Sequence, residues 1–121
     1  MSFDKILENL VEHTDGARGA VFLDRDGEVV QRYITRKGIA DIDLLGAYHG
    51  ITLSTCRKFS SEAEMGEIDV MICQYKDATC VIKTLNEGYF VLLALSPQGN
   101  IGKAMFSLKQ IADELNQEMG I

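Results

Sequence analysis

Hydrophobic residues recur along the chain with two different periods. Near the N-terminus they follow the i, i+3, i+4 spacing that lines one face of a helix, at Phe3, Ile6, Leu7, Leu10 and Val11. A C-terminal segment behind Asn100, a predicted helix cap, repeats in steps of four and three, at Ile101, Met105, Leu108, Ala112, Leu115 and Met119. A longer segment, from Ile39 to about Glu62, is also predicted to be helical. The pattern therefore indicates three helices.

Between these helices the pattern changes to short β-prone runs separated by turn residues. The five predicted strands are Gly19–Leu23, Glu28–Ile34, Glu67–Tyr75, Ala78–Leu85 and Tyr89–Leu95. Turns are predicted at Asp24–Gly27, at Lys76-Asp77 and at Asn86–Gly88. The last strand is an unbroken apolar run, which is typical of a central strand that is covered on both faces.

The order helix, two strands, helix, three strands, helix predicts one α/β (α+β) domain that spans residues 1–121. We expect a five-stranded, mostly antiparallel sheet with helices on both faces. Within the predicted third strand, Ile68, Val70 and Ile72 would share one face of the sheet. A two-residue turn at Lys76-Asp77 would place Cys73 opposite Cys80 and Met71 opposite Ile82.

Composition narrows the class of protein. The chain has 121 residues, 46% of them hydrophobic, and a formal net charge of −6. This size suits a single domain, and the negative charge argues against binding to nucleic acid. The longest apolar stretch, Tyr89–Leu95, is far shorter than the ~20 residues of a membrane span. Because the first residues do not resemble a signal peptide, we expect a cytoplasmic protein without membrane insertion.

The middle helix has an unusual centre, because no Asp, Glu, Lys or Arg occurs from Leu44 to Cys56. A helix without a charged face is normally covered on more than one side. Two apolar stripes are apparent. The first contains Ile42, Leu45, His49 and Cys56, and the second contains Leu44, Tyr48, Ile51 and Thr55.

Small residues also recur every four positions in this helix, at Gly46, Gly50 and Ser54. This spacing allows another backbone to approach closely. The residues could face the domain's own sheet or a second subunit, and we favour the subunit contact.

Candidate chemistry is sparse. The sequence contains no phosphate-binding glycine motif, and the run that begins at Asp24 lacks the glycine and glutamate that a calcium loop requires. His49 and Cys56 lie seven residues apart, roughly 10.5 Å along a helix, which is too far for a hydrogen bond. Cys56, Cys73 and Cys80 form no paired zinc motif and are expected to be reduced thiols. Arg25 and Arg36 are the exposed candidates for an arginine finger, and solvated surface charge is the interpretation that we favour for both. We assign no catalytic residue, metal or cofactor.

The order of elements and two local segments resemble the roadblock family, named for a dynein light chain and related in fold to profilin and longin domains. The segments are Gly16–Gly27, which forms the first predicted hairpin, and Gly102–Leu115, which lies in the last helix. The resemblance covers nearly the whole chain. It implies a homodimer, or a heterodimer with a paralogous roadblock protein, in which the middle helices pack together and the strands at Glu67–Tyr75 join edge to edge.

The resemblance also implies a function. Bacterial and archaeal relatives commonly regulate Ras-like small GTPases, whereas eukaryotic relatives act as scaffolds. We therefore expect a non-enzymatic dimeric regulator or adaptor of such a GTPase. The alternative is a constitutive scaffold with no nucleotide-dependent partner.

The residues expected at the dimer or partner interface come from the middle helix and the third strand. They are Ile42, Leu45, Gly46, His49, Gly50, Leu53, Ser54, Cys56, Ile68, Val70 and Ile72. Ile39, Tyr48 and Thr52 are further candidates on the helix. If His49 were buried between subunits, its protonation would make the dimer sensitive to mild acid.

Overall fold

The structure is a computed structural model that describes residues 2–35 and 41–121. Its elements follow the predicted order. They are α1 (Phe3–Glu12), β1 (Ala17–Leu23), β2 (Val29–Ile34), α2 (Ile42–Glu62), β3 (Val70–Gln74), β4 (Thr79–Thr84), the short 3₁₀ helix η1 (Asn86–Gly88), β5 (Phe90–Leu95) and α3 (Ile101–Met119). The prediction of an α+β domain with three long helices is confirmed.

The five strands form one sheet in the order β2-β1-β5-β4-β3, and all neighbouring strands are antiparallel. Every residue of β5 is buried, and this strand lies at the centre of the sheet. A strand in this position is apolar on both faces because both faces are covered. The prediction of a central strand here is therefore confirmed, although the strand begins at Phe90 and not at Tyr89.

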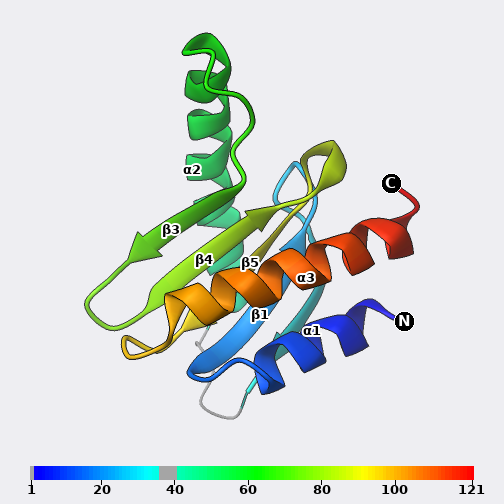
Figure 1. Cartoon of the computed structure of the whole chain (residues 1–121), viewed down its shortest axis with the longest axis vertical. Coiled ribbons are helices and arrows are strands. Elements are labelled where there is room, and N and C mark those ends of the chain that lie inside the picture. Colours follow the sequence, from blue (N-terminus) through cyan, green and yellow to red (C-terminus); the bar gives the residue numbers. More distant parts are fainter. Residues whose placement is uncertain (1, 36–40) are drawn as a thin grey trace.

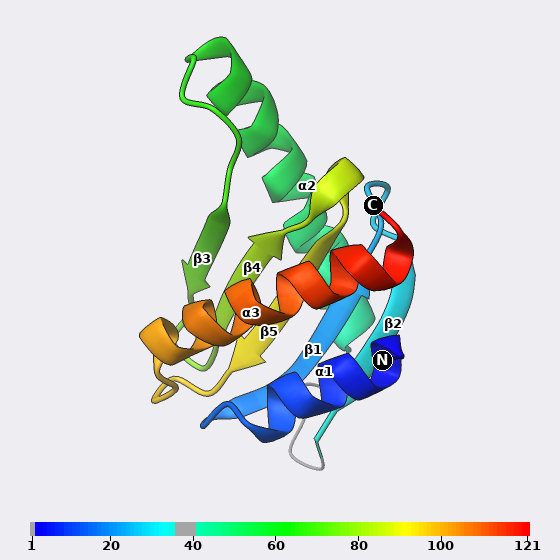
Figure 2. The ribbon, with the colours of Figure 1, turned by 45° about the vertical axis from the view of Figure 1, so that its right-hand side comes forward.

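Helices cover the sheet unequally. Helices α1 and α3 lie side by side on one face, and α2 lies alone on the other (Figures 1 and 2). Beneath α1 and α3, one core cluster joins Leu7 and Leu108 to Phe22 of β1. Beneath α2, a second cluster joins Ile42 and Leu53 to neighbouring sheet residues. The alternation of side chains along each strand separates the two clusters.

The helix ends follow their capping residues. The Asp41 carboxylate accepts a hydrogen bond from the Leu44 N–H, so α2 begins at Ile42. The predicted start at Ile39 lies outside the described residues. The Asn100 side chain caps α3 in the same way, as predicted, and Gly120 ends α3 in the left-handed conformation.

The first two hairpins form where the turn residues predict them. In the β1–β2 turn, the Asp24 carboxylate accepts hydrogen bonds from the N–H groups of Asp26 and Glu28, and Gly27 supplies a φ of +83°. In the β3–β4 hairpin, the Tyr75 N–H donates to the Ala78 carbonyl at 2.8 Å.

The register of this second hairpin is also as predicted. Cys73 lies opposite Cys80, and Met71 lies opposite Ile82.

Strand β3 is shorter than predicted. It begins at Val70, not at Glu67, and Ile68 packs against the cluster beneath α2, whereas Val70 packs against the opposite cluster. The Thr84 hydroxyl contacts the carbonyl oxygens of both Ile68 and Asp69, so the backbone departs from regular pairing before Val70. The expectation that Ile68 shares a face with Val70 is therefore wrong.

Helix α2 extends beyond the sheet. At ~1.5 Å per residue its 21 residues span roughly 30 Å, whereas the six residues of β5 span roughly 20 Å. The C-terminal part of α2 stands clear of the strands, and residues 63–69 lead back to β3 (Figures 1 and 2). This projection leaves helix surface that the single chain does not cover.

Candidate protein-interaction surface

Helix α2 presents a line of large hydrophobic side chains to solvent, which we name the outer stripe: Leu44, Tyr48, Ile51 and Phe59. These side chains are between 49% and 64% exposed. They repeat at helical spacing on the side of α2 that faces away from the sheet. Clustered apolar exposure of this kind is typical of a protein-interaction site.

The opposite side of α2, the inner stripe, packs on the sheet and consists of Ile42, Gly46, His49, Leu53 and Ser60. All five residues are buried in the single chain. Ile42, Gly46, His49 and Leu53 were predicted at a subunit contact, and their burial in the domain's own core corrects that assignment. The physical reason is close approach: Gly46 has no side chain, so this side of α2 comes within contact distance of Val21 and Leu23, and its larger residues fill the core of the same chain.

The small residues of α2 allow close approach to the sheet. A Cβ atom on Gly46 would lie 2.9 Å from Cγ1 of Val21, and one on Gly50 would lie 2.9 Å from the tip of the Phe90 ring. The intradomain alternative is therefore correct for both glycines. Ser54, the third member of the series, is exposed on the flank of the helix.

Leu45 and Cys56 are half-buried between the two stripes. Thr52 is exposed, and Ile39 lies outside the described residues.

His49 is held inside the domain and does not lie on its surface. Its Nδ1 lies 2.8 Å from the Leu45 carbonyl, so Nδ1 carries the hydrogen. In the neutral ring, Nε2 then accepts a hydrogen bond from the Tyr75 hydroxyl at 2.7 Å. The premise of an acid-sensitive histidine between subunits is not met, because His49 already has two partners in its own chain.

Tyr75 connects this buried histidine to the surface. It follows β3, its ring meets the His49 ring edge to face at 5.8 Å, and 54% of it is exposed. Burial is the main cause that raises the pKa of Tyr75, and negative charge on Cys73 or Cys80 would raise it further.

The outer edge of β3 is open: β3 is the last strand of the sheet, with β4 as its one neighbour among the described residues. It carries no charged residue, and Ile72 is exposed, whereas Val70 is half-buried. The other edge strand, β2, carries Arg32 and is irregular at Val30, where its register with β1 shifts; both features discourage edge pairing. Of the two edges, β3 is the better suited to accept a strand.

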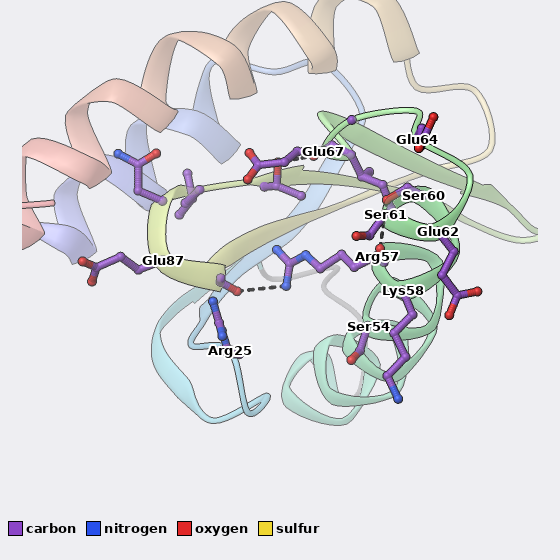
Figure 3. A pocket seen from close by; sticks show the side chains of 16 residues that line it. Arg25, Ser54, Arg57, Lys58, Ser60, Ser61, Glu62, Glu64, Glu67 and Glu87 are labelled. Carbon is purple, nitrogen blue, oxygen red and sulfur yellow. Dashed lines mark hydrogen bonds between the residues drawn. The ribbon is translucent and has the colours of Figure 1, made fainter.

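A groove of about 1070 Å³ opens beside the projecting part of α2 (Figure 3). It lies between this helix, η1 and the tip of the β1–β2 hairpin. We name it the Arg57 groove, because the half-buried Arg57 reaches across it to the Gly88 carbonyl at 3.2 Å. No sequence pattern predicted this groove.

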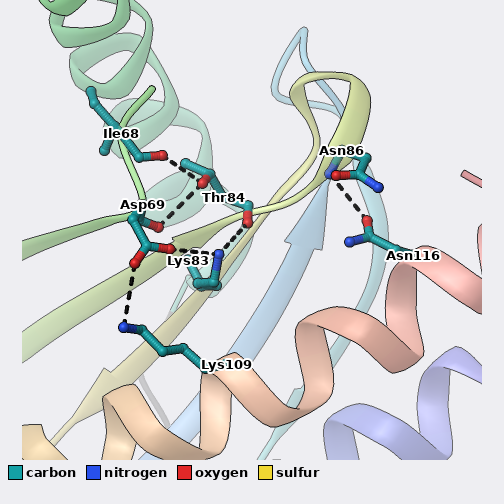
Figure 4. Close-up of polar contacts among 7 residues, drawn as sticks. All are labelled: Ile68, Asp69, Lys83, Thr84, Asn86, Lys109 and Asn116. Atoms are coloured by element: carbon teal, nitrogen blue, oxygen red, sulfur yellow. Dashed lines mark hydrogen bonds and ion pairs between the residues drawn. The ribbon is translucent and has the colours of Figure 1, made fainter. Parts of the chain in front are cut away.

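An ionic clamp fixes the return from α2 to β3 (Figure 4). The Asp69 carboxylate pairs with Lys83 of β4 at 2.8 Å and with Lys109 of α3 at 3.3 Å. Hydrogen bonding from Lys83 is the main cause that lowers the pKa of Asp69. At the far end of β4, Asn86 is bonded to Asn116 and to the Ile121 carbonyl, which ties down the end of α3.

The cysteines lie close together but are not activated. Burial, with a smaller contribution from a charge on Cys73, raises the pKa of the Cys80 thiol to about 11. Burial also raises the pKa of Cys73. Both shifts disfavour the thiolate, which is the reactive form. That these thiols remain reduced stays a prediction.

Two other candidate features can be assessed from the described residues. No group of three or more His, Cys, Asp or Glu side chains in residues 2–35 and 41–121 is arranged to hold a metal ion. Within the same ranges, no helix combines the length and the apolar character needed to cross a membrane. Arg36, one of the two arginine-finger candidates, lies outside these ranges.

Comparison with solved structures identifies the class of fold. A Roadblock/LC7 domain from Streptomyces avermitilis superposes with a TM-score of 0.88 at 14% identity, over 100% of both chains. The gliding protein MglB from Thermus thermophilus gives a TM-score of 0.73 at 18% identity, over 91% of this chain and 87% of that one. MglC from Myxococcus xanthus gives 0.70 at 24% identity, over 98% and 99%. The fold is that of the Roadblock/LC7 domain proteins, as the sequence resemblance predicted.

The sequence places the chain more narrowly. The family described as "mitogen-activated protein kinase kinase 1 interacting" matches residues 1–120, and the chain belongs to this family. No curated protein sequence matches the chain.

Proposed function

We propose that this protein is a non-enzymatic, dimeric regulator or adaptor that binds a Ras-like small GTPase. The outer stripe of α2 is the observation that carries the proposal, because a folded domain rarely leaves four large hydrophobic side chains in line on one helix. The fold shared with MglB and MglC, and the family's description as an interacting protein, support a role in binding other proteins. The GTPase as partner rests on the roadblock resemblance.

In the proposed dimer, the outer stripes of two chains pack together and the two β3 edges pair. Pairing would satisfy the open N–H and C=O groups of β3 and join two sheets into one. A homodimer or a heterodimer with a paralogous roadblock protein satisfies the same surface. The proposed interface therefore keeps Ile72 and the half-buried Leu45 and Cys56 from the sequence-based set, and adds the outer stripe.

A GTPase regulator needs only different affinities for the GTP-bound and GDP-bound partner. Paired α2 helices would give the dimer one composite face. We propose that the GTPase binds to this composite face, and we assign no catalytic residue to it.

The first test is the oligomeric state. Ile51→Asp introduces a charge in the middle of the outer stripe, and Phe106→Asp is a matched control, because Phe106 on α3 is 65% exposed and Ile51 is 64% exposed. Light scattering coupled to size exclusion should show a dimer for the wild type and for Phe106→Asp, and a monomer for Ile51→Asp with unchanged circular dichroism. A wild-type protein that is monomeric at micromolar concentration, without a paralogous partner, contradicts the homodimer.

The second test is the partner. Small GTPases from the same genome, loaded with GDP or with a non-hydrolysable GTP analogue, are captured on the immobilised protein. Unequal recovery of the two nucleotide forms supports a regulator, and equal recovery supports the constitutive scaffold. Ile51→Asp should recover neither form if the composite face is the binding site.

A further inference from the structure

Two arginines from distant parts of the chain converge on Gly88 in the Arg57 groove. Nη1 of Arg57, on α2, donates to the Gly88 carbonyl at 3.2 Å. The Arg25 side chain, from the β1–β2 turn, lies so close to the Gly88 Cα that a Cβ atom there would be 2.3 Å from Nε of Arg25. Gly88 also has a φ of +85°, so two independent constraints require glycine at this position. Figure 3 shows both guanidinium groups on the same side of η1.

The scaffold holds both arginines in place. The turn that carries Arg25 is fixed by the two backbone N–H groups bound to the Asp24 carboxylate. Arg57 projects from α2 at the level where the helix leaves the sheet, and its side chain is half-buried. The backbone that carries Arg25 is therefore fixed, and the Arg57 guanidinium is anchored by its bond to the Gly88 carbonyl.

Within residues 2–35 and 41–121, neither arginine forms an ion pair with an acidic side chain. Among the described residues, no Asp or Glu oxygen lies within 4 Å of the Arg25 or Arg57 guanidinium, although ion pairs form elsewhere in the chain. Burial and the charge of Arg25 lower the pKa of Arg57, against a smaller opposing effect of Glu67. A partly buried cation beside a second cation is unfavourable until an anion neutralises it. Guanidinium groups bind carboxylates and phosphates through two parallel hydrogen bonds, which suits them to this task.

The rim of the groove restricts the anion. Four carboxylates line the groove together with the two arginines and Lys58: Glu62, Glu64, Glu67 and Glu87. Glu62 and Glu87 extend outward at its two sides (Figure 3). A polyphosphate or nucleic acid would be repelled by this rim. A ligand with a single anion between positive charges fits the groove, because the anion can meet the arginines at the centre and the positive charges can meet the glutamates of the rim.

We propose that the Arg57 groove binds a segment of a partner protein in which one Asp or Glu carboxylate lies between Arg25 and Arg57, and in which flanking Lys or Arg side chains face the glutamates of the rim. The inference depends on the proposed function only in requiring a protein partner. A groove of about 1070 Å³ has room for such a segment, because pockets for drug-sized ligands measure roughly 300–1,000 Å³.

The test uses two capped pentapeptides, Lys-Lys-Glu-Lys-Lys and Lys-Lys-Gln-Lys-Lys, which differ only in the central carboxylate. Titration into ¹⁵N-labelled full-length protein, followed by the arginine Nε–Hε resonances, gives both affinities. We expect the Glu peptide to bind about tenfold more tightly than the Gln peptide, since one charge-assisted bidentate contact is worth on the order of 1.4 kcal/mol. The resonances of Arg25 and Arg57 should shift together.

Arg57→Gln should bring the ratio of the two affinities to about one, and Arg25→Gln should do the same. Because Arg25 is exposed, Arg25→Gln should keep the fold, and it tests the proposal even if Arg57→Gln does not fold. Arg32→Gln is the matched control, because Arg32 is an exposed arginine on β2 that already pairs with Asp43, and it should leave the ratio unchanged. Equal affinities for the two peptides in the wild type overturn the proposal. A ratio that persists in both Arg25→Gln and Arg57→Gln overturns it as well.

Titration with inorganic phosphate tests the remaining alternative, in which the groove binds a small free anion and not a peptide. If phosphate shifts both resonances at lower concentration than the Glu peptide, the groove is a small-anion site and the proposal is overturned. The result is independent of dimerisation and of the GTPase. Because the groove lies within one chain, Ile51→Asp should keep the tenfold ratio even if no small GTPase is ever captured.

Discussion

The helices on the two faces of the sheet differ in how much hydrophobic surface they leave exposed. On the face beneath α1 and α3, two helices enclose the larger core cluster, and along both helices one large hydrophobic side chain, Phe106, is exposed. On the other face, α2 alone encloses the smaller cluster and exposes four such side chains. We call the face beneath α1 and α3 the complete face, because a single chain covers it. We call the face beneath α2 the incomplete face, because its helix leaves apolar surface exposed.

The difference originates in the helices themselves. Helix α1 has one apolar stripe, which the sheet covers, and its remaining positions are mostly polar. Helix α2 has two stripes and no charged residue from Leu44 to Cys56. One sheet can cover only one side of a helix, so the second stripe is available to another molecule. The incomplete face is therefore where we expect the protein to act.

The largest expected effect separates the two stripes of α2. Leu53→Ala removes a fully buried side chain and should lower the free energy of unfolding by about 2–5 kcal/mol, because it leaves a cavity in the core. Ile51→Ala, two residues earlier on the outer stripe, should change the stability of the single chain by less than about 0.5 kcal/mol. Urea unfolding at two protein concentrations distinguishes the variants, since subunit association makes stability depend on concentration.

Leu53→Ala should lower the midpoint by a similar amount at both concentrations. Ile51→Ala should lower it chiefly at the higher concentration, which favours the proposed dimer. Equal losses for both variants at the lower concentration would show that the outer stripe also belongs to the core of the single chain.

A second prediction concerns the glycines that bring α2 close to the sheet. Gly50→Ala would place a methyl group 2.9 Å from the buried Phe90 ring in the central strand. Overpacking of this kind costs about 1–3 kcal/mol, against a gain of about 1 kcal/mol in helix propensity. Gly102→Ala on α3 is the comparison. Its new methyl group would lie 3.3 Å from Asn100 Oδ1 at an exposed position, so this variant gains helix propensity without overpacking the core.

Thermal unfolding should therefore rank Gly50→Ala below the wild type and below Gly102→Ala. If Gly50→Ala is instead as stable as Gly102→Ala, α2 can move away from the sheet more easily than the packing indicates.

These glycines also show how far the sequence could be interpreted. Periodicity predicted the three helices, the central strand and the presence of two stripes on α2, and the turn at Lys76-Asp77 predicted the register of the β3–β4 hairpin. It did not assign each stripe to a neighbour, because spacing defines the angle between stripes and not which of them faces the sheet. Gly46 and Gly50 indicate close approach, and the sheet of the same chain was the closer surface.

Other features depended on contacts between distant segments. The start of β3 is set by the Thr84 hydroxyl, which lies in β4, and the Arg57 groove is made by residues from three elements. The bond between Tyr75 and His49 depends on how α2 crosses the sheet. Local patterns carry no information about such pairs.

The third prediction tests this link across the incomplete face. Tyr75→Phe removes the hydroxyl that donates to Nε2 of the buried His49 and should destabilise the protein by about 1 kcal/mol, because a buried acceptor loses its partner. Tyr48→Phe on the outer stripe is the matched control, and its effect on the single chain should be within about 0.5 kcal/mol. Chemical denaturation at low protein concentration measures both. Indistinguishable variants would mean that the His49–Tyr75 bond contributes nothing to holding α2 on the sheet.

The smallest expected effect concerns the clamp that joins the two faces. Asp69 lies where the chain returns from α2, and it pairs with Lys83 and with Lys109 of the complete face. Because its side chain is largely exposed and screened by water, Asp69→Asn should cost only about 0.2–1 kcal/mol at neutral pH. Asp113→Asn, at an exposed position of α3, should cost less.

The pH dependence identifies the charge as the cause of this loss. The lowered pKa of Asp69 in the folded state means that its contribution is present above the unfolded pKa of about 4 and disappears as the pH falls through the folded pKa. The difference in unfolding free energy between the wild type and Asp69→Asn should therefore be constant from about pH 5 to 7 and vanish in stronger acid. High salt should reduce it at neutral pH, since screening weakens exposed ion pairs. A difference that persists at low pH and high salt would assign the role of Asp69 to its shape and hydrogen bonds, and the two faces would then be joined by packing alone.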